Sequence, residues 1–203
     1  MNKKKLYTLV GSLVLVGAIG VGATLAYFTD NDVATNVVTM GHVDIDLDEP
    51  NYTPGIDNVM EDLVPGETIT KDPTITVAEN SQPAFIRAKI EFLMDGAPME
   101  AKYASELEGQ LTLEGTKLVE DTSWKKGEGN YYYFQYEVDP GEKIVLFDEV
   151  TIPSNWGNDV ADSEIQIIVS AEAIQSENFE PYVEGGQILG WNGVTVDTYN
   201  PGN

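Results

Sequence analysis

Four acidic residues near the end of one predicted strand are the first candidates for chemistry. Asp44, Asp46, Asp48 and Glu49 supply clustered carboxylate oxygens, the ligands that calcium prefers. Alternate residues of a strand diverge from any single point, however, and the sequence has no D-x-D-x-D-G loop with a terminal Glu. We therefore interpret these residues as a solvated strand face, with Asp44, Asp46 and Asp48 as weak metal candidates, and expect no cofactor.

His42 is the single histidine, and the chain has no cysteine. This excludes a two-histidine zinc site, a thiolate metal site and a disulfide framework within the chain. An imidazole with a nearby carboxylate could serve a serine nucleophile, but the sequence lacks the G-x-S-x-G pattern of a nucleophile elbow. We expect His42 to be an ordinary surface or edge histidine and the chain not to be an enzyme.

Three tryptophans form the remaining candidate site. With the tyrosine cluster at 131–136, Trp124, Trp156 and Trp191 could form a surface on which a carbohydrate stacks. Buried aromatic anchors are the more common role for such residues. We favour the core interpretation and keep a carbohydrate-binding surface as the alternative.

Charge restricts the partners of this chain. It has 203 residues, of which 34 are acidic and 11 basic, for a net charge of −23. Nucleic acids and anionic membrane surfaces repel such a protein, so we expect neither as a partner. A hydrophobic fraction of 42% is sufficient for a packed core. If the chain assembles, its self-repulsion suggests that salt, cations or lower pH gate the process.

The N-terminus has the organisation of an export signal. Three lysines (Lys3, Lys4 and Lys5) precede residues 6–26, which contain no charge. About 20 apolar residues can cross a membrane, so this segment is a signal peptide or, if uncut, a membrane anchor. Thr24 and Ala26 place small residues before Tyr27, as signal cleavage requires. We predict cleavage there, with membrane contact only through the uncleaved signal.

Strands must position the candidate residues in the mature chain. Period-two alternation of apolar residues predicts strands over 33–47, 68–78, 84–92, 144–152 and 165–173, with Pro73 at an edge or bulge. In 84–92, Arg87, Lys89 and Glu91 are predicted to form a wet outer face. Residues 111–119 suggest a hairpin, and 131–136 a central strand covered on both faces.

One helix and a C-terminal hairpin complete the expected elements. Met99, Tyr103 and Leu107 fall on one side of a helix over 99–107. A short strand or hairpin is possible over 187–196. Many short strands with turn signals predict an all-β, antiparallel two-sheet sandwich. We expect four segments: the signal peptide 1–26, the mature N-terminal segment 27–36, the sandwich 37–179 and a glycine-rich C-terminal segment 180–203.

Six motifs, in order, resemble one family of exported proteins. They are ATLAYFTD (23–30), NVVTMGHVDIDL (36–47), LVPGETITKDP (63–73), AFIRAKI (84–90), FDEVTIP (147–153) and AEAIQ (171–175). Together they resemble the TasA/camelysin (CalY) family of biofilm-matrix fibre proteins of Gram-positive bacteria, which a SipW-type signal peptidase processes. The resemblance implies a jelly-roll-like sandwich, processing by such a peptidase, and a secreted, extracellular-matrix or cell-surface location.

The resemblance also implies a mode of assembly. The new N-terminus, with Tyr27, Phe28, Thr29, Val33 and Thr35 as its anchors, would add as a donor strand to the sandwich of the next subunit. The partner is then a second copy or a related matrix subunit. The alternatives are a monomeric matrix- or surface-binding module that uses loops around Trp156 and Trp191, and, with less support, a camelysin-like secreted protease.

Overall fold

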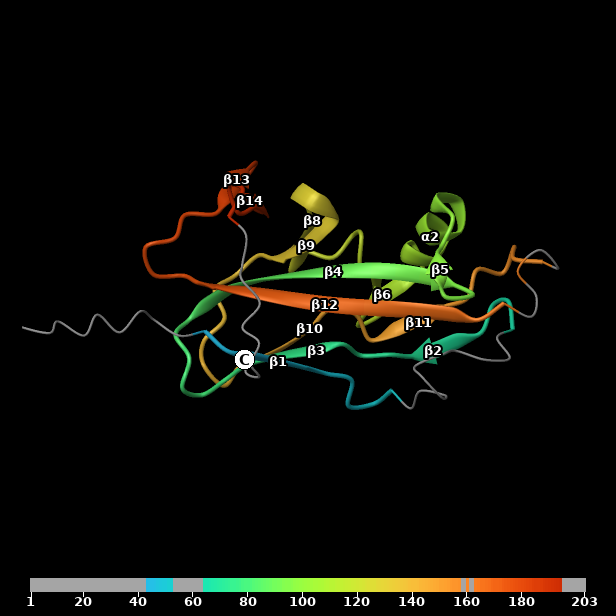
Figure 1. Ribbon diagram of the computed structural model, residues 1–203, viewed down its shortest axis with the longest axis horizontal. Helices are drawn as coiled ribbons and strands as arrows, with labels where there is room; N and C mark the ends of the chain where they lie inside the picture. The colour runs from blue at the N-terminus through green and yellow to red at the C-terminus, as the bar shows by residue number, and fades with distance from the viewer. Residues whose placement is uncertain (1–42, 53–63, 158–159, 161–162, 195–203) are drawn as a thin grey trace, which may run out of the picture. The chain divides into compact units, whose positions relative to one another are not determined.

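Two eleven-residue strands dominate the part of the chain that the computed structural model describes, which is residues 43–52, 64–157, 160 and 163–194. β4 (Ala84–Met94) and β12 (Ile165–Gln175) pair antiparallel over their whole lengths (Figure 1). Both arise where the sequence alternates apolar and polar residues. All described residues belong to one compact unit.

The sheet around β4 has the order β12-β4-β9-β8, and β5 (Ala97–Pro98) also pairs with β4. β9 (Tyr131–Phe134) lies between β4 and β8 (Trp124–Lys126), after the short 3₁₀ turn η2 (Glu128–Asn130). Tyr132 and Tyr133 point to opposite faces, and both are buried. The predicted central strand with both faces covered is therefore confirmed.

Two further sheets contain the remaining long-range pairings. The first has the order β1-β3-β10 and contains β1 (Ile45–Asp48), β3 (Thr74–Val77) and β10 (Lys143–Val145). The second has the order β2-β11-β6-β7 and contains β2 (Thr68–Thr70), β11 (Glu149–Thr151), β6 (Leu111–Leu113) and β7 (Thr116–Lys117). The predicted hairpin is the β6–β7 pair, whose turn residues Glu114 and Gly115 have φ of 50° and 77°.

Two predicted strands are each divided between these sheets, so the prediction of single strands over 68–78 and 144–152 was wrong. Pro73, which has no N–H to donate, follows the point where β2 ends and precedes β3. At the switch, the Lys71 N–H donates to the Asp148 carbonyl (3.1 Å) and the Leu146 N–H to the Pro73 carbonyl (3.0 Å). The two crossing segments therefore stay side by side where the sheets meet.

One apolar core lies among these sheets. Its buried members come from both sides, including Ile75 and Val150 from the smaller sheets and Ile86 and Ile167 from the β4–β12 sheet. Helix α2 (Ala101–Glu108) closes over this core through Leu107, with Met99 and Tyr103 beside it, as the 3.6-residue spacing predicts. The described part is thus mostly β, with several antiparallel sheets and one α-helix, and the jelly-roll topology stays a prediction.

A short hairpin near the C-terminus packs on the outer face of β9. It consists of β13 (Tyr182–Glu184) and β14 (Gln187–Gly190), joined at Gly185 and Gly186, and so begins before the predicted range 187–196. The Gln135 side chain binds both backbone groups of Ile188, at 2.8 and 2.9 Å. This hairpin and Trp191 form a second, smaller apolar cluster with Tyr133.

Arg87 corrects the expected wet outer face of β4. It is only 8% exposed because Tyr131 and Trp191 cover its guanidinium, whose carbon lies 4.1 and 4.2 Å from the two ring centroids. Its charge is paired with Glu172 on β12. Glu91 on the same strand is exposed, as predicted.

Candidate functional site

Two strand edges border an open groove. β1 and β12 are edge strands of different sheets and lie next to each other. Between them lies a groove of about 400 Å³, lined by Leu47, Asp48, Glu49, Tyr52, Lys71, Ile167, Ile168 and Val169. This groove, the β1–β12 groove, is the strongest candidate for a functional site in the described part of the chain.

The β12 edge has backbone groups that no described strand uses. The Asp95 N–H donates to the Glu164 carbonyl, and the Ser176 N–H donates to the Pro83 carbonyl, both at 2.9 Å. Alternate residues of an antiparallel strand direct their N–H and C=O groups to the same side, so the even-numbered residues bond to β4. The backbone groups of Ile165, Ile167 and Val169 therefore point away from β4, where they can accept another strand.

The β1 edge is open in the same sense. The Ala78 N–H donates to the Asp44 carbonyl at 3.0 Å, so the backbone groups of Asp44, Asp46 and Asp48 face β3. Those of Ile45 and Leu47 point away from β3, and among the described strands none pairs with them. The groove thus has a potential ladder of hydrogen-bonding groups on each border.

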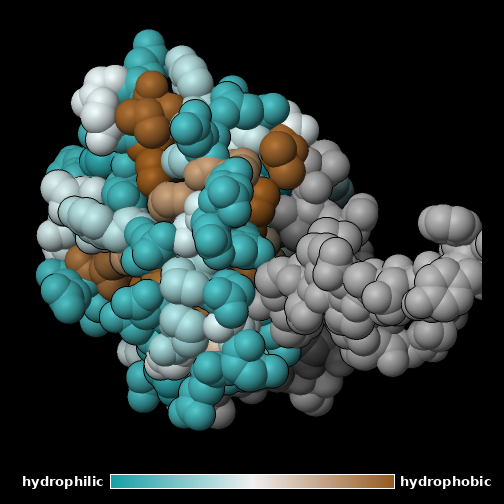
Figure 2. Space-filling view, turned by 90° about the vertical axis from the view of Figure 1, so that its left-hand side faces the viewer, coloured by the Kyte–Doolittle hydropathy of each residue, from teal (hydrophilic) through white to brown (hydrophobic). Residues whose placement is uncertain are grey.

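Apolar side chains are exposed at the groove. Leu47 and Ile168 are 36% and 44% exposed, while Ile167 is buried and Val169 is half-buried. On the face that Figure 2 shows, hydrophilic residues predominate and apolar residues gather in several patches. A strand laid in the groove would cover Leu47 and Ile168, which favours its addition because apolar area leaves water.

A buried lysine forms the charged part of the groove. Lys71 is 3% exposed, and its Nζ lies 2.6 Å from Glu49 Oε1 and 4.2 Å from the centroid of the Tyr52 ring. Burial, followed by the nearby Glu49 charge, raises the pKa of Tyr52. These contacts fix residues 49–52 against the body, so the groove has a defined wall at this point.

The three aspartates considered as metal candidates form an exposed strand face. Asp44, Asp46 and Asp48 are all exposed. In the described part of the chain, no group of three or more His, Cys, Asp or Glu side chains is placed to hold a metal ion. The residues do not fit a zinc site, because zinc prefers nitrogen and sulfur ligands and the sequence has one His and no Cys.

The tryptophans do not form a stacking surface, since all three are buried. Trp124 Nε1 donates to the Val145 carbonyl at 2.9 Å, and Trp156 Nε1 donates to Glu106 Oε2 at 2.8 Å. Trp191 packs edge-on against Tyr133 and Phe179. The core interpretation is confirmed, and the aromatic loops proposed for a binding module lose their basis.

The N-terminal predictions lie outside the described residues. These are the cleavage residues Thr24, Ala26 and Tyr27, the donor residues Tyr27, Phe28, Thr29, Val33 and Thr35, and His42. In the part of the chain that is described, no helix is long and apolar enough to cross a membrane.

Sequence reasoning missed the groove and its lysine. The alternation of residues 165–173 predicted the strand but not that β12 ends a sheet, which depends on the order of strands in space. Lys71 has the same parity as Ile69 and Ile75, so alternation places it on the core side of the predicted strand. That position was the signal in the sequence that could have indicated a buried lysine.

Comparison with known proteins bears on the N-terminal part. Residues 1–82 match the family model described as camelysin metallo-endopeptidase. The resemblance to the TasA/camelysin family is thereby confirmed over these residues. The match includes β1 and Lys71 of the groove and ends before β4. No curated protein and no solved structure matches the chain.

Proposed function

We propose that this camelysin-like chain is a secreted, non-enzymatic subunit of extracellular matrix fibres. The mature N-terminal strand of one subunit would enter the β1–β12 groove of the next. The observation that carries the proposal is a groove with exposed apolar side chains, bordered by two strand edges with which no described strand pairs. An added strand satisfies the edge N–H and C=O groups and seats alternate side chains between them.

The donor is the segment 27–36, exposed by cleavage before Tyr27. Residues Tyr27, Thr29, Val33 and Thr35 share one parity, with Phe28 on the other, so either face offers an aromatic anchor. Before cleavage the same segment is tied to the membrane, so a SipW-type peptidase would act as the assembly switch. Release then places the subunit in the extracellular matrix or at the cell surface.

The contact between donor and groove is heterologous, because it joins two different surfaces of one chain. Such contacts generate open filaments when the rotation between subunits does not close a ring. A jelly-roll-like sandwich completed by the donor strand is the architecture that this proposal requires. A related matrix subunit could replace the second copy without changing the chemistry.

The family name suggests a secreted protease as the competing function. The described residues do not fit a metal site, so we derive no catalytic step for this chain. A chelator-sensitive proteolytic activity that survives purification to homogeneity would support the protease function instead.

Two groove substitutions test the proposal in a chain that begins at Tyr27. Val169→Arg and, independently, Leu47→Lys place a long charged side chain at the groove and should abolish filaments in electron micrographs. Val183→Arg, at an exposed residue of β13 outside the groove lining, is the matched control and should assemble normally. Circular dichroism verifies that each variant is folded. Filaments formed equally by all three variants would contradict the groove as the acceptor.

A further inference from the structure

One side chain closes the open end of the C-terminal hairpin. The last backbone pair of the hairpin is Tyr182 with Gly190. Just beyond this pair, Asn192 Nδ2 donates to the Glu180 carbonyl at 2.9 Å. This hydrogen bond joins the segment that enters the hairpin to the segment that leaves it, so the Asn192 amide helps to hold β13 and β14 together.

Asn192 and Gly193 form the centre of a tight turn at the surface. Their φ angles are 52° and 75°, and the Val194 N–H donates to the Trp191 carbonyl at 2.9 Å, which is the pattern of a type I′ turn. Both residues are exposed, and a Cβ on Gly193 would have no neighbour within 4 Å. Among the described residues, no group accepts a hydrogen bond from the Gly193 N–H. Water therefore reaches the Gly193 nitrogen.

An asparagine that precedes a glycine can react with its own backbone. The Gly193 nitrogen attacks Asn192 Cγ, the bond from Cγ to Nδ2 breaks, and the proton from the Gly193 nitrogen leaves with Nδ2 as ammonia. Water then opens the resulting five-membered imide at either carbonyl, which leaves aspartate or isoaspartate at position 192. Glycine favours the reaction because it has no side chain to obstruct ring closure. The only co-reactant is water.

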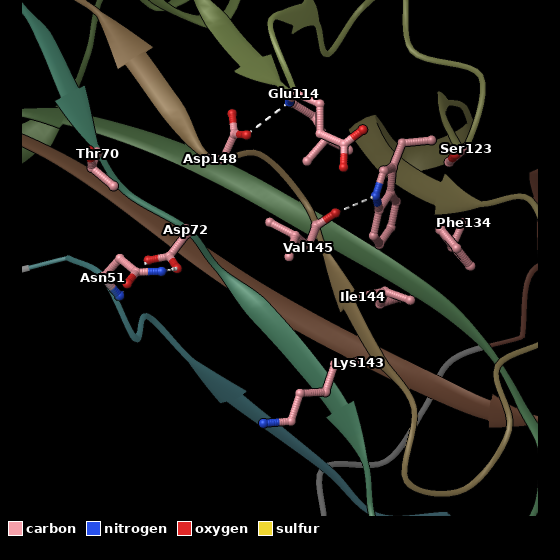
Figure 3. Close-up of a pocket in the computed structure, with 12 residues that line it drawn as sticks. Asn51, Thr70, Asp72, Glu114, Ser123, Phe134, Lys143, Ile144, Val145 and Asp148 are labelled. Atoms are coloured by element: carbon pink, nitrogen blue, oxygen red, sulfur yellow. Dashed lines mark hydrogen bonds between the residues drawn. The ribbon is translucent and has the colours of Figure 1, made fainter.

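Asn192 differs from the other asparagines in the residue that follows it. Asn192–Gly193 is the single Asn-Gly pair of the sequence. Asn51 is also exposed, but its N–H and its Nδ2 donate to the two Asp72 oxygens at 2.9 and 2.7 Å (Figure 3). The N–H that follows Asn51 donates to the Glu49 carbonyl at 3.3 Å, so the nitrogen that would have to attack is already bonded. We therefore expect reaction at Asn192 and not at Asn51.

Conversion of Asn192 removes the bond that closes the hairpin. A carboxylate has no N–H to donate, and its oxygen is repelled by the Glu180 carbonyl oxygen. Isoaspartate also lengthens the main chain by one carbon, which the i to i+3 hydrogen bond of a tight turn does not accommodate. Trp191 directly precedes this turn, and its ring centroid lies 4.2 Å from the Arg87 guanidinium carbon, so loosening the turn frees the ring from Arg87. A two-stranded hairpin is marginally stable alone, so β13 and β14 would then separate from β9.

We propose that Asn192 is a self-modification site and that its deamidation releases the C-terminal hairpin from the outer face of β9. The product uncovers Arg87 and Tyr133, against which Trp191 packs in the unmodified chain. Ring closure requires the amide to leave the Glu180 carbonyl, so the rate depends on how often this end of the hairpin opens. The change is one-way, because ammonia is lost. The inference does not rest on fibre formation, since it uses a different surface.

Peptide mass spectrometry of the purified chain tests the modification. After incubation, the peptide that contains Asn192 should gain the mass of the acid form, and part of it should accept a methyl group from an isoaspartate methyltransferase. The reaction should be faster in mildly alkaline than in neutral buffer, because hydroxide deprotonates the attacking nitrogen. The peptide that contains Asn51 should keep its amide. An unchanged Asn192 peptide in both buffers, or equal conversion at Asn51, would overturn the proposal.

Hydrogen exchange tests the consequence for the hairpin. Asn192→Asp reproduces one product and should speed exchange of the β13 and β14 amides by about tenfold, because the closing hydrogen bond is lost. Asn178→Asp is the matched control, since Asn178 is also exposed, has a φ of 63° and would add the same charge. The aged wild-type chain should behave as Asn192→Asp does. Exchange that is unchanged in Asn192→Asp and in the aged chain, or raised equally by Asn178→Asp, would overturn the release of the hairpin.

Discussion

Arg87 joins three elements through one side chain. Its Nε and Nη2 donate to Glu172 Oε2 at 2.7 and 2.5 Å, which links β4 to β12. Its guanidinium is stacked between Tyr131 of β9 and Trp191 after β14. A planar guanidinium suits this position because it can donate in its plane while its faces contact aromatic rings.

Replacing Arg87 should therefore destabilise the fold. Arg87→Met keeps the stem but leaves Glu172 without its cation, and we expect the free energy of unfolding to fall by about 3 kcal/mol. Lys89→Met, on the same strand, breaks a half-exposed pair with Glu91 and should cost less than about 1 kcal/mol. Urea denaturation measures both. Equal losses would show that Arg87 is not an essential link.

Because of Tyr132, the stability of the fold should depend on pH in the alkaline range. Burial, followed by the charge of Glu108, raises the pKa of Tyr132, whose hydroxyl donates to Glu108 Oε1 at 2.8 Å. Above about pH 10 a tyrosine in the unfolded chain ionises, while Tyr132 in the folded chain stays neutral. The contribution of Tyr132 to the free energy of unfolding is therefore fully present below about pH 10. Above about pH 10 it decreases by about 1.4 kcal/mol per pH unit.

Tyr132→Phe tests this dependence. At pH 7 the variant should be less stable by about 1 kcal/mol, because the hydrogen bond to Glu108 is lost. The difference should vanish above pH 10 and reverse near pH 11, since phenylalanine does not ionise. Thermal denaturation between pH 7 and 11 provides the measurement, with the exposed Tyr136→Phe as the control. A constant difference across this range would contradict the assignment.

At the scale of elements, β14 is held against the start of η2 by a close backbone approach. A Cβ on Gly127 would lie 2.1 Å from the Leu189 carbonyl oxygen, so the two segments touch only because residue 127 has no side chain. The C-terminal hairpin is therefore docked through backbone contact as well as through Trp191.

Gly127→Ala should displace the β13–β14 hairpin from its contact with residue 127. We expect a loss of about 2 kcal/mol in stability and faster hydrogen exchange of the β13 and β14 amides, because the added Cβ overlaps backbone atoms of Leu189 and neither group can rotate away. Gly109→Ala is the matched control, since its nearest neighbours lie 3.5 Å from the added Cβ and its φ is −68°. Unchanged exchange in β13 and β14 would contradict this view of the docking.

Elements that depend on local sequence patterns could be predicted, and features that depend on the order of strands in space could not. β4, β12 and α2 could be predicted because their apolar period is local, and β9 and the β6–β7 hairpin because an aromatic run and a turn glycine are local too. The divisions at Pro73 and between β10 and β11 could not, since alternation does not indicate which sheet each half joins. The burial of Arg87 and the open edge of β12 depend on Trp191 and on strand order, which no local pattern contains.

For the whole molecule, two features act in opposite directions. A net charge of −23 makes subunits repel one another, which keeps a single copy in solution. The β1–β12 groove offers unpaired backbone and apolar surface that a second copy can cover. Under the proposed function, assembly requires the donor segment, which cleavage before Tyr27 would expose.

Electron microscopy of two chains, one beginning at Tyr27 and one beginning at Asn36, tests this claim most directly. The account predicts filaments from the longer chain when salt is raised or pH is lowered, and monomers from the shorter chain at every salt concentration and pH. Filaments from both chains, or only monomers from the longer chain at high concentration, would contradict it.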